Sequence, residues 1–198
     1  MEKAHFGTKI SAFLESPRIL KPRFLVSSIW EVEHLRRMRR GSIYDWRYAS
    51  PRSLDHNLCT DEGLNRLLDV MFHGTTQIGT WYVGVFETNT TILATHTYAV
   101  PGFTECTTSY DEATRPVYVE AAASSKVTTN TASKASFTFN AGKTVYGGAL
   151  FGGGTDPTVK GDAAGGGVLY CACLFGAPKA VVDDDVLKVT ISLTGADV

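Results

Sequence analysis

The feature that most constrains this chain is a strict two-residue alternation near its C-terminus. Over residues 187–193, large aliphatic side chains alternate with polar ones; the aliphatic positions are Leu187, Val189, Ile191 and Leu193. Successive side chains of a β-strand point to opposite faces, so this pattern predicts a strand with one buried and one solvated face. Such half-buried strands are typical of antiparallel sheets.

Several other apolar segments have the length and composition of strands. They are Thr80–Phe86, Val117–Val119, Ala135–Phe139, Thr144–Phe151 and Val168–Phe175. Glycine runs at residues 152–154 and 165–167 frame a loop between the last two, which favours a hairpin. The sequence therefore predicts a mainly β fold: an antiparallel β-sandwich or jelly-roll-like body with one short helix and an extended N-terminal arm.

The one predicted helix spans residues 61–73. It carries a single apolar stripe at the i, i+3, i+4, i+7 spacing, formed by Leu64, Leu67, Leu68 and Met71. Thr60 is placed to cap its N-terminus, and Gly74 to stop it. We expect the stripe to be buried against the sheet.

Residues 1–56 differ in charge from the rest of the chain. They hold eleven Lys and Arg against six Asp and Glu, a net of 11 − 6 = +5, whereas residues 57–198 hold eight against fourteen, a net of 8 − 14 = −6. Prolines at 17, 22 and 51 interrupt any long helix. The sequence thus divides into an extended basic arm, 1–56, and a β-sandwich body, 57–198, that includes the helix.

Aromatic and arginine side chains gather in the second half of this arm. The predicted partner-binding residues are Trp30, Arg36, Arg37, Arg39, Arg40, Tyr44, Trp46 and Tyr48. Arginine clusters bind phosphates, and exposed aromatic rings stack on bases. Docking on an acidic protein surface is the favoured alternative, because nucleic-acid modules usually carry their positive charge on the folded body, and this body is acidic.

Motifs of catalysis or cofactor binding are missing from the sequence. The glycine runs lack the lysine and the following helix of a phosphate-binding loop, and neither HExxH nor GxSxG occurs. Asp183, Asp184 and Asp185 form a solvated turn before the last strand rather than a metal site in this interpretation. Four cysteines show no zinc-site spacing, so we expect reduced thiols. The prediction is a protein that is not an enzyme, with no cofactor and no metal.

One segment also resembles a known group of proteins. Asn57–Phe86, NLCTDEGLNRLLDVMFHGTTQIGTWYVGVF, resembles the opening of virion structural proteins of tailed bacteriophages. Downstream, Gly102–Glu105, Ser109–Pro116 and the closing segment Val182–Thr190 also resemble the corresponding parts of these proteins. The likeness covers about residues 57–194. It implies a β-sandwich body, assembly in multiple copies and no catalytic residues to carry over.

Three functions are compatible with these features. The first is a capsid decoration or cement protein that binds neighbouring capsid subunits through its arm, so that deleting residues 1–50 leaves a folded body that no longer attaches. The second is a tail, collar or fibre-attachment protein of the virion, and the third is a carbohydrate-binding domain that contacts the host. No signal peptide or membrane span is visible, so we expect synthesis in the host cytoplasm and a place in the virion. The expected partners are other virion proteins and copies of itself.

Overall fold

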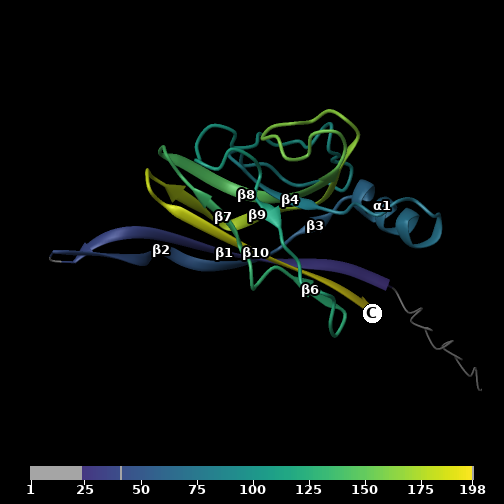
Figure 1. Cartoon of the computed structure of the whole chain (residues 1–198), viewed down its shortest axis with the longest axis horizontal. Coiled ribbons are helices and arrows are strands. Elements are labelled where there is room, and N and C mark those ends of the chain that lie inside the picture. The colour runs from purple at the N-terminus through teal and green to yellow at the C-terminus, as the bar shows by residue number, and fades with distance from the viewer. Residues whose placement is uncertain (1–23, 41, 198) are drawn as a thin grey trace, which may run out of the picture.

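Two antiparallel β-sheets packed face to face make up most of the molecule (Figure 1). The computed structural model describes residues 24–40 and 42–197. A mainly β fold with one short helix, predicted from the sequence, is confirmed. Residues 1–23 of the predicted arm lie outside the described residues.

The first sheet is built around the alternating C-terminal segment. It contains β1 (Phe24–Arg40), β2 (Ile43–His56), β6 (Val127–Thr129), β7 (Ala135–Thr138) and β10 (Val186–Asp197). β10 is central: β1 runs antiparallel along one side of it, from the pair Phe24–Asp197 to the pair Leu35–Val186. The short strands β6 and β7 share its other side, and β2 pairs with the outer edge of β1.

The second sheet contains the remaining strands. They are β3 (Leu58–Cys59), β4 (Trp81–Phe86), β5 (Val117–Tyr118), β8 (Lys143–Gly153) and β9 (Gly167–Val181), in the spatial order β3-β9-β8-β4-β5. β8 and β9 form the predicted hairpin. Its turn requires the left-handed backbone conformation that glycine favours, with φ of +65° at Gly153 and +75° at Gly165.

The core lies between the two sheets. The aliphatic residues Leu187, Val189 and Ile191 of β10 are fully buried, as their alternation predicts. They share one cluster with Trp30 and Val32 of β1. From the other sheet the cluster receives Val83, Val85, Val145, Leu150, Tyr170, Cys171 and Cys173.

The first two strands belong to the sandwich itself. The sequence placed the boundary between arm and body at residue 56, but β1 pairs with β10 over most of its length, and Trp30 and Val32 are wholly buried. The physical reason is that these two apolar side chains complete the core opposite β8 and β9. Of the described residues of β1 and β2, the outer half of the hairpin extends beyond the sandwich, at the left of Figure 1.

Helix α1 (Asp61–Phe72) begins and ends close to its predicted limits. The Thr60 side chain accepts a hydrogen bond from the Gly63 amide at 3.0 Å, which confirms the predicted N-cap. Gly74 follows the helix with φ +71°. The Glu62 carboxylate accepts hydrogen bonds from the amides of Tyr98 and Leu169, which ties the first turn to the body.

The expected burial of the helix stripe is wrong for its second half. Leu64 and Leu67 pack on the core, but Leu68 is 51% exposed, Met71 65% and Phe72 82%. The cause is the docking of the first turn, where Gly63 packs against the backbone of Tyr170 in β9. Because the helix is fixed at this end, its later turns extend away from the sheets (Figure 1).

Candidate interaction surfaces

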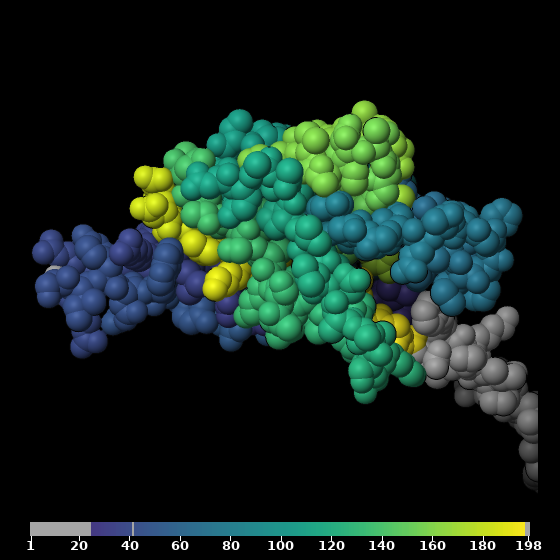
Figure 2. All heavy atoms as spheres, in the orientation of Figure 1, coloured from purple at the N-terminus to yellow at the C-terminus, as the bar shows by residue number. Residues whose placement is uncertain are grey.

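The outer half of the β1–β2 hairpin is a two-stranded ribbon. β10 starts at Val186, opposite Leu35, so the strands beyond this pair have no third strand beside them. We call residues 36–47 the ribbon. Figure 2 shows that most of it projects beyond the rest of the described molecule. At its base, Arg36, Arg37 and Tyr44 line a hollow together with the turn at residues 182–185. Isolated two-stranded hairpins are only marginally stable in water, so the persistence of the ribbon requires anchoring at the base.

An ion cluster supplies that anchor. Arg36 donates from Nε to Asp185 Oδ1 at 2.7 Å and from Nη2 to Asp185 Oδ2 at 2.6 Å. His34 Nε2 lies 2.8 Å from the same Oδ2, and the Val182 amide donates to it as well. The expected solvated turn before the last strand is confirmed for Asp183 and Asp184, which are exposed, but the expectation is wrong for Asp185, which is fully buried.

The protonation of Asp185 follows from these contacts. Burial alone would raise the pKa of the carboxyl group, but the hydrogen bonds from Arg36 and His34 outweigh it and hold the pKa below the ordinary 3.8. Ser50 Oγ lies 3.4 Å from His34 Nδ1, so Ser50, His34 and Asp185 lie in contact in that order. Because Arg36 takes both oxygens of the carboxylate, the arrangement has the character of a structural ion cluster.

The outward face of the ribbon carries the predicted aromatic and basic residues. In the strand register, Arg37 is opposite Trp46 and Arg39 is opposite Tyr44, and cross-strand partners share a face. The Arg37 guanidinium lies 5.1 Å from the centre of the Tyr44 ring. Tyr44, Trp46 and Tyr48 are 56%, 50% and 53% exposed. We call the ribbon residues Arg37, Arg39, Tyr44 and Trp46, together with Tyr48 just beyond the base of the ribbon, the ribbon face.

Three predicted partner-binding residues lie elsewhere. Trp30 is fully buried in the core, and its indole N–H donates to Ser28 Oγ at 3.1 Å, so it is not available to a partner. Arg36 belongs to the ion cluster. Arg40 is exposed at the tip of the ribbon, where it pairs with Ile43. The structure therefore brings together five of the eight residues on one face.

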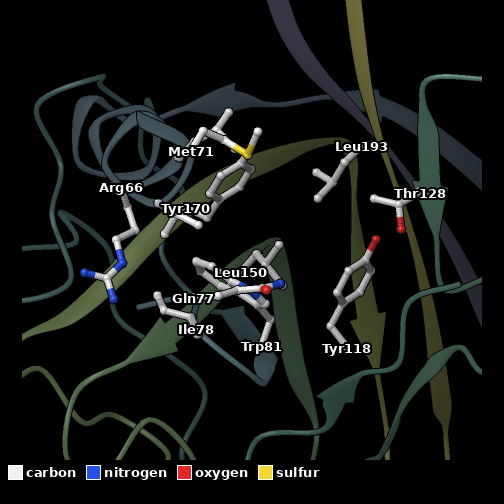
Figure 3. A pocket seen from close by; sticks show the side chains of 12 residues that line it. Arg66, Met71, Gln77, Ile78, Trp81, Tyr118, Thr128, Leu150, Tyr170 and Leu193 are labelled. Atoms are coloured by element: carbon white, nitrogen blue, oxygen red, sulfur yellow. The ribbon is translucent and has the colours of Figure 1, made fainter. Parts of the chain in front are cut away.

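A second surface lies at the other end of the molecule, beside α1. A cavity of about 350 Å³ opens there between the helix and the edges of both sheets (Figure 3). Its walls are mostly apolar; they include Leu67, Val70 and Met71 of α1 with Ile78, Trp81, Tyr118, Leu150, Tyr170 and Leu193. The rings of Trp81 and Tyr170 meet edge to face with centroids 5.5 Å apart.

The cavity continues into a second hollow toward the start of β1. This hollow, of about 510 Å³, shares Leu67, Tyr170 and Leu193 with the first and adds Val26. Together they form what we call the helix groove, with the exposed Met71 at its rim and Phe72 next to it in the helix. Arg66 lines the first hollow and Lys126 the second, and neither hollow is lined by an acidic residue. An exposed, mostly apolar hollow of this kind is a candidate binding surface.

The sequence did not predict the helix groove, because Leu68 and Met71 were expected to be buried. A signal was nevertheless present. Val70 and Phe72 are apolar but lie outside the predicted stripe, which gives the helix a second apolar side.

Among residues 24–40 and 42–197, no group of three or more His, Cys, Asp or Glu side chains is arranged to hold a metal ion. Within the same residues, no helix is both long and apolar enough to cross a membrane. All four cysteines are free and buried, in agreement with the expected thiols.

No protein-family model matches the chain, and no curated protein matches it. The two surfaces therefore have to be interpreted from their own chemistry.

Proposed function

We propose that this chain is a non-enzymatic structural protein of a tailed phage particle, and that it works as a capsid decoration or cement protein. The observation that carries the proposal is that two candidate binding surfaces, the ribbon face and the helix groove, lie at opposite ends of one sandwich (Figure 1). A cement protein has to contact two neighbours at once, and two separated surfaces meet that requirement. The resemblance of residues 57–194 to virion proteins supports the same proposal.

The ribbon face is the surface that attaches to capsid subunits in this proposal. Aromatic and arginine side chains dominate the binding energy of protein interfaces, and here five such side chains share one exposed face. The ribbon, residues 36–47, holds five Arg and one Asp, a net of 5 − 1 = +4. We therefore expect an acidic patch on the capsid surface that receives it.

The carbohydrate-binding alternative receives less support. A sugar site would set exposed rings in a groove opposite paired carboxylates. On the ribbon, the rings of Tyr44 and Trp46 stand on a projecting surface opposite Arg39 and Arg37. Glycan-array binding by the purified chain would revive this alternative.

Counting copies tests the proposal. Quantitative mass spectrometry of purified particles gives the ratio of this chain to the major capsid protein. Copy numbers comparable to the capsid protein are expected. A small number that matches a tail or portal ring would replace decoration with a collar or fibre-attachment role, and absence from particles would overturn the virion assignment.

A second experiment tests the attachment surface. Particles lacking the chain are incubated with purified wild-type chain or with a Trp46→Ser, Tyr44→Ser variant, and bound chain is measured after sedimentation. Binding that drops at least 30-fold for the variant, or about 2 kcal/mol, is expected of two central anchors. Leu54→Ser is the matched control, because Leu54 is 70% exposed on β2 but lies outside the ribbon. Equal binding by all three proteins would contradict attachment through the ribbon face.

A further inference from the structure

The helix groove differs in charge from the body that contains it. Residues 57–198 hold eight Lys and Arg against fourteen Asp and Glu, a net of 8 − 14 = −6. Within the described chain, however, the charged side chains that line the two hollows are both basic, Arg66 in the first and Lys126 in the second. An apolar surface with this lining favours an occupant that carries negative charge.

The acidic residues of α1 do not contribute to the groove. The Glu62 carboxylate is occupied, because it accepts hydrogen bonds from the amides of Tyr98 and Leu169. Asp61 and Asp69 are exposed on the helix and line neither hollow. The basic lining of the groove therefore differs locally from the acidic helix beside it.

Lys126 is held at the second hollow by a backbone conformation that lysine rarely adopts. Ser125 and Lys126 have φ of +51° and +66° in a two-residue turn, across which Ser124 and Val127 exchange backbone hydrogen bonds of 2.9 and 3.0 Å. Turns with positive φ at both positions strongly favour Asn-Gly, because glycine adopts this conformation without strain. The Lys126 carbonyl also accepts from the Gly195 amide at 3.0 Å, which fixes the turn to β10. A strained residue that lines a cavity is a candidate for a functional role.

Arg66 has unmet hydrogen-bond donors at the edge of the first hollow. Among the described residues it makes one hydrogen bond, from Nη2 to the Thr76 carbonyl oxygen at 3.0 Å, and its Nε is buried without an acceptor. Figure 3 shows the guanidinium at the edge of the cavity, beside the apolar side chains of the wall. Guanidinium groups form their strongest hydrogen bonds with carboxylates, so a carboxylate at this edge would supply an acceptor.

The two hollows are large enough to take side chains. Their volumes, about 350 and 510 Å³, exceed the roughly 150 Å³ of an apolar cavity that binds benzene. They share Leu67, Tyr170 and Leu193 in their walls, so one short segment of chain can fill both.

We propose that the helix groove binds a short apolar segment of a neighbouring virion protein, whose acidic side chains pair with Arg66 and Lys126. Apolar side chains of the segment fill the two hollows, and the charge pairs orient it. The ribbon of a second copy is unsuited to this place, because its net charge of +4 would meet a basic lining. The inference rests on the proposed function, in which the groove is the surface for a second neighbour.

A peptide titration tests the chemistry of the groove. The full chain with Trp46→Ser and Tyr44→Ser is titrated with two short peptides that share the same leucines, one with glutamates and one with lysines between them. The chain has three tryptophans, so without Trp46 the fluorescence reports on Trp30, which is wholly buried, and on Trp81 in the groove wall. The glutamate peptide should bind at least about tenfold more tightly than the lysine peptide.

Substitutions of the two basic residues locate this preference. Lys126→Gly should remove much of it and leave the free energy of unfolding nearly unchanged, because relief of the strained turn offsets the greater freedom of glycine in the unfolded chain. Arg66→Gln, added to Lys126→Gly, should remove the rest. Lys188→Gln is the matched control, because it removes a positive charge from β10 outside both hollows. A merely structural role of Lys126 would lower stability together with binding.

Particles that lack the chain test the source of the segment. The Lys126→Gly, Arg66→Gln variant, with its ribbon intact, should bind them at least about tenfold more weakly than wild type or Lys188→Gln. Equal affinity for the two peptides, or undiminished particle binding by this variant, would overturn the inference. Sedimentation velocity that shows wild type self-associating through the groove would also overturn it, because a second copy would then be the occupant.

The proposed function fails separately from this inference. A chain that is absent from particles but prefers the glutamate peptide overturns the virion role, and with it the source of the segment but not its chemistry. A chain that is present on particles but binds the two peptides equally overturns only the inference about the groove.

Discussion

Trp30 in the first sheet lies directly against Gly148 in the second. A Cβ atom built on Gly148 would be 2.5 Å from Cζ3 of the Trp30 ring, closer than carbon atoms approach in folded proteins. The indole therefore occupies the space of a missing side chain and fixes the distance between the sheets at this point. Neither residue can change without affecting the other.

This contact predicts two large effects on stability. Gly148→Ala should lower the free energy of unfolding by about 1–3 kcal/mol through overpacking, and Trp30→Ala by about 3–5 kcal/mol through the cavity it leaves. Urea unfolding followed by circular dichroism measures both. Trp46→Ala is the matched tryptophan control, and we expect a change within about 1 kcal/mol because Trp46 is 50% exposed. A similar loss for both tryptophans would contradict the core position of Trp30.

Asp185 should make the free energy of unfolding depend on pH. Its pKa is lower in the folded state than the ordinary 3.8, so its contribution is fully present above that value and is lost as pH falls through the folded-state pKa. Asp185→Ala should cost about 3–5 kcal/mol at neutral pH, because His34 and Arg36 lose their shared partner. Thermal unfolding of wild type and variant between pH 2 and pH 7 measures the difference, and the two curves should converge at the acid end. Parallel curves would contradict this assignment.

Gly63→Ala should destabilise the protein even though alanine favours helices. A Cβ at this position would overlap backbone atoms of Tyr170, and the backbone of a paired strand cannot move aside as the end of a flexible side chain can. We expect a loss of about 1–3 kcal/mol, against the gain of about 1 kcal/mol that helix propensity alone predicts. Asn65→Ala, on the exposed side of the same helix, should be neutral or stabilising. A stabilising Gly63→Ala would show that α1 does not dock through its first turn.

The four thiols should be unreactive in the native protein. Burial raises the pKa of the Cys106 thiol to about 12, and it also raises the pKa of Cys59, Cys171 and Cys173. Because the thiolate is the reactive form, an aromatic disulfide reagent at pH 8 should label none of the thiols until denaturant is added, and then all four. Rapid labelling of even one native thiol would contradict its buried position.

Truncation distinguishes the predicted arm from the observed strands. The sequence predicts that deleting residues 1–50 leaves a folded body, but this deletion removes β1 together with Trp30 and Val32 of the core. We now expect the shortened chain to be unfolded or aggregated by circular dichroism and light scattering. Replacing only residues 37–46 with a short turn should preserve the fold and abolish attachment.

Local sequence patterns were sufficient to predict much of the fold. The alternation of β10, the cap of α1 and the β8–β9 turn each depend on neighbours in sequence, and each is found close to its predicted place. The position of β1 depends instead on a pairing with β10 more than 150 residues away, which no local pattern encodes. Prolines and basic residues near Trp30 indicated an arm. The position of Trp30 is decided instead by the space beside Gly148, which has no side chain, and this space exists only once the two sheets have folded.

The candidate surfaces show the same division. The aromatic residues at 44, 46 and 48 could be assigned to one face because strand alternation is local. The helix groove could not be predicted, since its walls come from the helix and from strands of both sheets. Whether Met71 is covered depends on where α1 ends relative to the sheets, and that is a property of the tertiary structure.

The pairing of β1 with β10 also governs when this protein can fold. The first described strand is hydrogen-bonded to the last one, so the first sheet cannot form during translation until residues 186–197 have left the ribosome. Until then Trp30 has no sheet to cover it, and its strand is exposed to other nascent chains on the same message. Contacts so distant in sequence also slow folding. A protein of this topology that is made in many copies would need its last strand to be synthesised soon after the first. Loss of the last dozen residues would remove the strand that pairs with β1, and the core would stay exposed to solvent.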